Sequence, residues 1–206
     1  MEQNIGQLAN QALKNISNNA VVQAKQSLAV QRKCEAVVKR YGDFNSFVKT
    51  FNRDMQEKAG QHIDRVFTGN APSLAIIDQT YGEDSAATFI MCHLQIVQDF
   101  CGIPNKLSPE KLFEIGKTIA AGFYYLKASE FCLFFLWLKC GKYGKFYGCI
   151  DPIVITNALQ SFCKERVDYI DKAEKEQNLK RAIELRNRPH AVTFEEYLRM
   201  KNEQQR

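Results

Sequence analysis

Apolar residues recur at helical spacing along most of the chain, and alternating patterns typical of strands are scarce. The first series begins at Ile5. A polar continuation rich in alanine, glutamine and lysine runs to Arg40, where Tyr41-Gly42 supplies a C-terminal stop. Because this segment has few large apolar residues, we expect it to lie on the surface or to pair with another chain. A second helix is predicted from Phe44 to near Gly60.

Capping signals mark the starts of the later helices. A Ser, Thr or Asp side chain accepts hydrogen bonds from the free N–H groups of the first turn, and Pro is tolerated at the first helical position. Such signals occur at Asp84 or Ser85, at Ser108-Pro109, at Ser129, at Asp151-Pro152 and at Thr193. The helix after Ser129 is apolar on nearly every side, which predicts a central place in the core.

These patterns predict an all-α fold, a compact multi-helix bundle with long helical N- and C-terminal arms. We expect an N-terminal arm and helix at 1–66, a core helical domain with a connector rich in Gly, Lys and aromatic residues at 67–170, and a charged helical tail at 171–206. The longest apolar run is far shorter than the roughly 20 residues that span a bilayer, and the N-terminus has no secretion signal. Seven widely spread cysteines favour reduced thiols. We therefore expect a cytoplasmic protein without a membrane partner.

The charges are distributed unevenly, although the net charge is only +5. Residues 67–105 contain no Lys or Arg and carry a charge of −4, whereas residues 106–149 carry seven Lys against three Glu. A basic centre beside an acidic stretch can attract nucleic acid or an acidic partner. The two stretches can equally complement each other within the fold.

The run from Lys139 to Pro152 joins two apolar helical segments with three glycines, three lysines and three aromatic residues. In a functional interpretation, its lysines contact phosphates while a tyrosine stacks on bases; the residues are Lys139, Lys142, Tyr143, Lys145 and Tyr147. In an architectural interpretation, the run is a rigid connector that ends one helix, turns tightly and starts the next; the residues are Gly141, Gly144, Gly148, Asp151 and Pro152. The two interpretations are compatible, since a rigid loop can carry a binding surface.

Other motifs do not point to chemistry. Gly116-Lys117-Thr118 ends like a phosphate-binding loop, but the required earlier glycine is missing and the tripeptide lies within a helix, so we expect Gly116 to allow close helix packing. The Gly-x-x-Gly motif from Gly141 to Gly144 lacks the strands of a KH domain. The cysteine spacings do not match a structural zinc site, and no histidine has a recognisable catalytic partner. We predict no catalytic residue, no metal site and no cofactor.

Several segments together resemble a known family. They are Tyr81-Gly82, the run from Tyr124 to Phe135, Gly141 to Gly148, and Asp151 to Thr156. The last two segments together form the pattern G-x-Y-G-x-F-Y-G-x-x-D-P-x-x-I-T. This pattern is similar to that of a family of unknown function from Bacteroides-type bacteria, their mobile elements and phages, and the resemblance covers roughly residues 70–170. By size and setting, the resemblance implies replication accessory factors such as helicase loaders or primosome components.

Two functions are therefore predicted. The first is a non-enzymatic, nucleic-acid-associated accessory protein in the replication of a mobile element or phage, which binds DNA or RNA through the connector and a protein partner, or a second copy of itself, through the arms. The alternative is a structural or regulatory protein–protein interaction module that does not bind nucleic acid.

Overall fold

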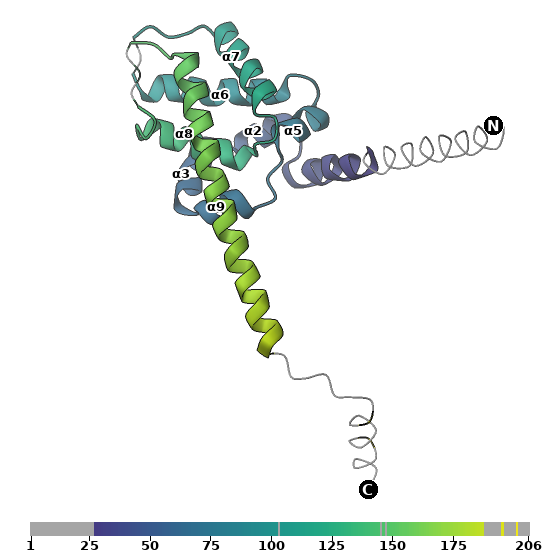
Figure 1. The fold of residues 1–206 in the computed structure, drawn as a ribbon. Helices are drawn as coiled ribbons and strands as arrows, with labels where there is room; N and C mark the ends of the chain where they lie inside the picture. Colours follow the sequence, from purple (N-terminus) through teal and green to yellow (C-terminus); the bar gives the residue numbers. More distant parts are fainter. Residues whose placement is uncertain are drawn as a thin grey trace, which may run out of the picture. The chain divides into compact units, whose positions relative to one another are not determined.

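Helices make up most of the protein, and the predicted all-α class is confirmed (Figure 1). The computed structural model describes residues 27–102, 104–144, 146, 148–187, 195 and 201. The first helix spans 27–41, and the others are α2 (Phe44–Thr50), α3 (Arg53–Gln61), α4 (Ile63–Thr68), α5 (Leu74–Tyr81), α6 (Ser85–Phe100), α7 (Pro109–Gly122), α8 (Ala128–Lys139) and α9 (Pro152–Asn187). The predicted start of the first helix and the capping signal at Thr193 lie outside the described residues.

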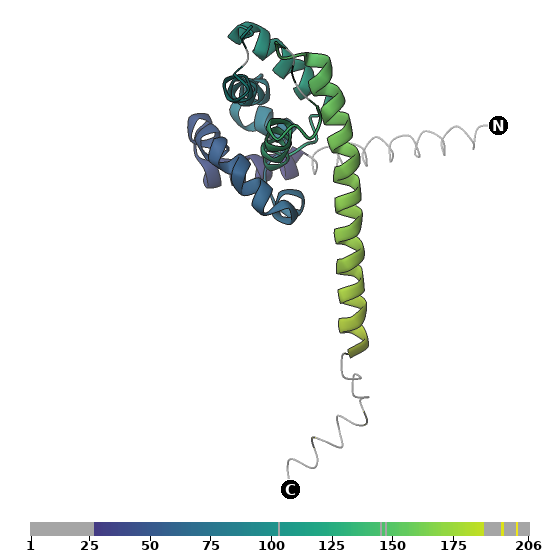
Figure 2. The ribbon, with the colours of Figure 1, turned by 90° about the vertical axis from the view of Figure 1, so that its left-hand side faces the viewer.

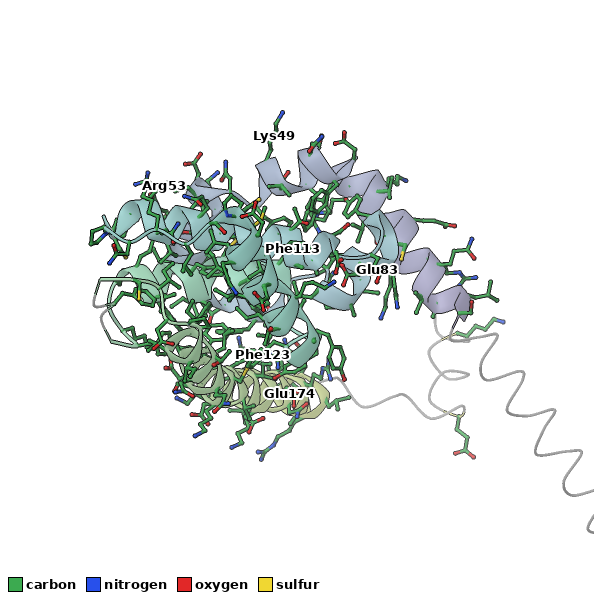
Figure 3. All side chains as sticks on the ribbon, turned by 90° about the horizontal axis from the view of Figure 1, so that it is seen from above. Lys49, Arg53, Glu83, Phe113, Phe123 and Glu174 are labelled. Carbon is green, nitrogen blue, oxygen red and sulfur yellow. The ribbon has the colours of Figure 1, made fainter. Side chains whose placement is uncertain are left out.

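The chain divides into two compact units, Met1–Arg166 and Val167–Arg206. The first unit is built around α8, whose Phe131, Phe134 and Phe135 are fully buried, as the apolar pattern of this helix predicts. Burying one such side chain stabilises the fold by roughly 1.5–3 kcal/mol. Helices α2 to α4 contribute to the same unit, and Phe47 of α2 is fully buried. Lys49 and Arg53 mark the solvent-facing side of α2 and α3 (Figure 3).

The single helix predicted from Phe44 to Gly60 is wrong, because the chain breaks at Phe51 and Asn52. The Asn52 side chain accepts hydrogen bonds from the N–H groups of Asp54 and Met55, at 2.9 and 3.1 Å, and so begins α3. Phe51 leaves helical geometry and is 3% exposed. The break lets Phe51 enter the core while α3 takes a new direction.

Two of the predicted caps are confirmed. The Ser108 hydroxyl accepts from the N–H of Lys111 at 3.4 Å, and the Asp151 carboxylate accepts from the N–H of Ile153 at 2.8 Å. Both precede a proline in the first turn of their helices, α7 and α9, so these two starts could be predicted from local sequence alone.

At α6 the N-cap is Asp84, one of the two predicted residues, but its side chain does not cap the helix, and the predicted cap of α8 is wrong. At α6, Asp84 makes no capping bond, and the Asp78 carboxylate of α5 accepts from the N–H of Ala86 at 2.7 Å instead. At α8, the N-cap is Lys127 rather than Ser129, whose hydroxyl donates to the carbonyl of Val66 at 3.1 Å. Tertiary contacts occupy the groups involved: the Asp78 carboxylate bonds to Ala86 at α6, and the Ser129 hydroxyl bonds to Val66 at α8.

Gly116 lies where α7 passes closely over α6, and the predicted role in helix packing is confirmed. A Cβ atom at this position would lie 2.5 Å from the carbonyl oxygen of Ala87. No such contact is tolerated between real side chains and backbone, so glycine is required for the observed approach of the two helices.

Helix α9 is continuous from Pro152 to Asn187 (Figure 2). Its first part buries Ile155, Leu159 and Phe162 in the first unit. Within the second unit, the described helical residues are largely exposed and highly charged. Among the described residues, no helix combines the length and the apolar character that a membrane span requires.

Candidate functional site

The connector between α8 and α9 begins with a glycine C-cap. The N–H of Gly141 donates to the carbonyl of Leu138 at 3.0 Å, and the N–H of Lys142 donates to the carbonyl of Trp137 at 3.1 Å. Gly141 has φ +75°, the left-handed conformation that such a cap requires. Gly144 and Gly148 also have positive φ, +107° and +82°. These positive φ values favour glycine, and the structural role assigned to these glycines and to Asp151-Pro152 stays a prediction.

Lys142 bonds to Glu165 on α9. Its ammonium group forms an ion pair with the Glu165 carboxylate and lies over the Trp137 ring, 3.3 Å from the ring centroid. The lysine and glutamate side chains are only 38% and 33% exposed. A cation held by both a carboxylate and an indole face is partly neutralised before any ligand arrives.

Tyr143 folds back toward the core. Its ring stacks on the fully buried Phe134, with centroids 5.9 Å apart and planes 28° apart, and its hydroxyl donates to Glu165 at 3.4 Å. Burial raises the pKa of Tyr143 above its ordinary value, and the Glu165 carboxylate raises this pKa further. One face of the ring is therefore already occupied by a protein aromatic.

Lys139 contacts different elements from Lys142. Its ammonium group lies 5.2 Å from the ring centroid of Phe100, at the C-terminal end of α6. Burial lowers the pKa of Lys139, and the positive charge of Arg53 on α3 lowers this pKa further. Lys139 and Lys142, the two predicted phosphate-binding lysines that the structure describes, therefore contact different residues.

Lys145 and Tyr147 lie outside the described residues. The predicted nucleic-acid site of Lys139, Lys142, Tyr143, Lys145 and Tyr147 consequently stays a prediction. What the described members establish is that Lys142 and Tyr143 converge on Glu165, a residue that the sequence analysis did not select. No local motif marks Glu165, because its partner lies 23 positions earlier.

An open groove of about 580 Å³ lies beside this cluster. Lys142 and Tyr143 form one wall, and the other wall comes from the first turns of α9, where the lining residues are Val154, Asn157, Ala158, Ser161 and Glu165. The groove holds one positive and one negative side chain, and these two are paired with each other. Its electrostatic field is therefore weak for a site that must attract a charged ligand.

A second link between α8 and α9 lies deeper. The Glu130 carboxylate is fully buried, accepts from Nε of Arg166 at 2.8 Å and accepts from the N–H of Lys127 at 2.9 Å. The side chain of Arg166 is 20% exposed. This pair was not predicted from the sequence, although a Glu at the third helical position is a known capping signal. Two Glu side chains thus fix α9 against α8 and the connector.

The described cysteine and histidine side chains lie in different surroundings. Among the described residues, no three His, Cys, Asp or Glu side chains come together as metal ligands would. Cys132 is buried, whereas Cys140 and Cys149 are exposed, so the three do not share one environment. His93 is 1% exposed, and its Nδ1 lies 2.7 Å from the side-chain amide of Gln56. Burial lowers the pKa of His93 to about 4, which keeps the imidazole neutral in the core.

Comparison with curated proteins and with solved structures found no match to this chain. A family model did match: residues 107–205, which include α7, α8, the connector and α9, are similar to a family of unknown function (DUF6633).

Proposed function

We propose that the protein is a non-enzymatic structural or regulatory protein–protein interaction module. The connector between α8 and α9 sets the geometry of the module, and other surfaces meet the partner. The observation that carries this proposal is the convergence of Lys142 and Tyr143 on Glu165. A loop whose cation is paired and whose ring is stacked on the core is built to hold two helices together.

The nucleic-acid-associated accessory protein is the second candidate. Its support is the net charge of +5 and the seven Lys between residues 106 and 149. Lys142 would have to exchange Glu165 for a phosphate, and Tyr143 would have to leave Phe134 before a base could stack on that face of its ring. Both exchanges lose existing contacts, so the first proposal needs fewer rearrangements. A role in the replication of a mobile element or phage, and a source among Bacteroides-type bacteria, belong to this second candidate.

Affinity purification of the tagged chain from its source organism, with and without nuclease, tests the two proposals. For an interaction module, a protein partner remains in a fixed ratio to the chain after nuclease treatment and a high-salt wash. For a nucleic-acid-associated factor, nuclease or high salt removes whatever is captured, because phosphate contacts weaken steeply with salt. Capture of nucleic acid with no nuclease-resistant protein would refute the interaction module.

A further inference from the structure

A second groove in the first unit shares no lining residue with the groove beside the connector. It lies between the helix at 27–41, the segment from Thr68 to Ser73, and Tyr125 with Lys127, and it has a volume of about 600 Å³. A neighbouring groove of about 400 Å³ shares Arg40, Tyr41 and the backbone of residues 69–71 with it. We call the two together the 69–73 groove. Residues 69–71 line both parts, and Pro72 and Ser73 line the larger one.

The 69–73 groove is basic. The Arg40 guanidinium lies over the Tyr41 ring, 5.2 Å from the ring centroid, but among the described residues no carboxylate faces the positive side chains of the lining. Lys33, Arg40 and Arg65 line it, all three are exposed, and no Asp or Glu lines either part. Within the part of the chain that the structure describes, none of the three forms an ion pair. Lys127 differs from them, since its ammonium group donates to the carbonyls of Phe67 and Gly69 at 2.8 and 2.9 Å. This arrangement contrasts with the paired charges of the connector.

The rest of the lining combines apolar and aromatic side chains with the polar residues Thr50, Thr68, Asn70, Ser73 and Ser129. Val37 and Phe51 are buried, and Tyr41 packs edge-on against Phe47 with ring centroids 5.6 Å apart. Tyr125 is 44% exposed at the rim. Aromatic residues and Arg are the side chains most enriched where proteins bind other proteins, because they combine large contact area with hydrogen-bonding capacity.

The 69–73 segment offers an unpaired peptide edge. Its backbone is extended at both ends, at Gly69 and Ser73. One edge bonds to residues 124–128: the N–H of Ala128 donates to the carbonyl of Pro72 at 2.9 Å, and Ser73 forms an antiparallel bridge with Lys127. On the other edge, the N–H and carbonyl of Ala71 and the N–H of Ser73 have no hydrogen-bond partner among the described residues. An extended peptide can pair with such an edge.

We propose that the 69–73 groove binds an extended acidic peptide segment of a partner protein. The partner backbone pairs with the free edge of Ala71 and Ser73, its carboxylates lie against Lys33, Arg40 and Arg65, and an apolar or aromatic side chain packs against Tyr41. The free N–H and carbonyl groups favour a peptide over a nucleic acid, because a phosphodiester backbone offers acceptors but no amide donors. This inference rests on the proposed function and names the chemistry of the partner.

Fluorescence anisotropy with labelled, end-blocked peptides tests the inference. The first probe alternates glutamate with tyrosine, the second has glutamine in place of glutamate, and the third is the acidic peptide N-methylated at every second backbone nitrogen. We expect the acidic probe to bind saturably and the other two to bind about tenfold more weakly or worse, because they lose the charge or one hydrogen-bonding edge. Lack of binding by the acidic probe, or equal binding of all three, would overturn the proposal.

A pair of charge reversals locates the binding site on the chain. We expect the variant Lys33→Glu with Arg40→Glu to lose about tenfold or more in affinity for the acidic probe, whereas the matched control Lys172→Glu with Lys175→Glu, which has the same net charge, keeps parental affinity. All four side chains are exposed, and circular dichroism checks that both variants stay folded. Equal affinity of the two variants would overturn the assignment. If labelled oligothymidylate binds in place of the peptide and the groove variant abolishes that binding, the groove is a nucleic-acid site and the proposal is wrong.

The groove variant also separates this inference from the proposed function. In the affinity purification, a nuclease-resistant partner captured equally by the parent and by the groove variant would refute the groove while leaving the interaction module intact. Capture of nucleic acid alone by the parent would refute the interaction module itself.

Discussion

Protonation of His93 should destabilise the protein as the pH falls. Burial lowers the pKa of this imidazole to about 4, from 6.5. The ring is stacked on Phe135, with centroids 5.1 Å apart and planes 5° apart, and its Nδ1 lies against the Gln56 amide. Below pH 6.5 the unfolded chain takes up a proton that the folded protein does not, so the stability conferred by neutral His93 is fully present above this pH and is lost as the pH falls toward 4.

The size of the effect follows from the two pKa values. Between pH 7 and pH 5, this single group removes about 2 kcal/mol from the free energy of unfolding, on a scale of 1.36 kcal/mol for each unit of pKa shift. Carboxylates also titrate in this range, so the comparison must be made with a variant. His93→Gln keeps a hydrogen-bonding side chain but cannot be protonated, and His62→Gln is the control, since His62 is exposed.

Urea unfolding at a series of pH values, followed by circular dichroism, measures this difference. We expect His93→Gln to be less stable than the parent at pH 7 and to approach it at pH 5, while His62→Gln follows the parent throughout. If the parent and His93→Gln lost stability in parallel between pH 7 and pH 5, the buried, neutral imidazole would not account for the pH dependence.

Three further substitutions test the packing. Glu130→Ala leaves Arg166 without its partner in a mostly buried position, and we expect a loss of about 3 kcal/mol or more in urea unfolding; a loss below about 1 kcal/mol would contradict the buried pair. Gly116→Ala forces a methyl group toward the Ala87 carbonyl and should reduce stability by about 1–3 kcal/mol in the same assay, whereas unchanged stability would show that the two helices separate freely. Lys142→Ala removes a partly exposed pair, so we expect a change within about 1 kcal/mol, and a larger loss by thermal unfolding would mean that the connector is more deeply coupled to the core.

The helical class and the role of Gly116 could be predicted because they depend on local spacing. Apolar periodicity along α8 identifies the core helix. A glycine inside an amphipathic helix weakens that helix, a cost that close packing of a neighbouring element can offset, so Gly116 indicates such packing. The caps at Ser108 and Asp151 likewise depend on residues within one turn. The helical class and these two caps therefore need no knowledge of distant contacts.

The break at Phe51 and the contacts of the connector could not be predicted, because distant residues determine them. Phe51 leaves the helix in order to pack against Phe89 of α6, whose ring centroid lies 6.4 Å away. Lys142 looked available for a ligand because its partner, Glu165, is not near it in sequence. The 69–73 groove could not be predicted for the same reason, because its lining residues are far apart in sequence, from the helix at 27–41 to Lys127.

The central claim is that the connector between α8 and α9 is architectural and does not contact phosphates. Its most direct test is the salt dependence of nucleic-acid binding by the parent and by the double variant Lys142→Ala with Lys145→Ala. Anisotropy titrations with labelled oligothymidylate and with a short DNA duplex, at several salt concentrations, measure it. If the connector is architectural, the parent and the double variant give the same titration at every salt concentration. If instead the affinity of the parent falls steeply with salt, and the slope of log affinity against log salt becomes shallower by about 1.4–1.8 in the double variant, the two lysines contact phosphates and the claim is wrong.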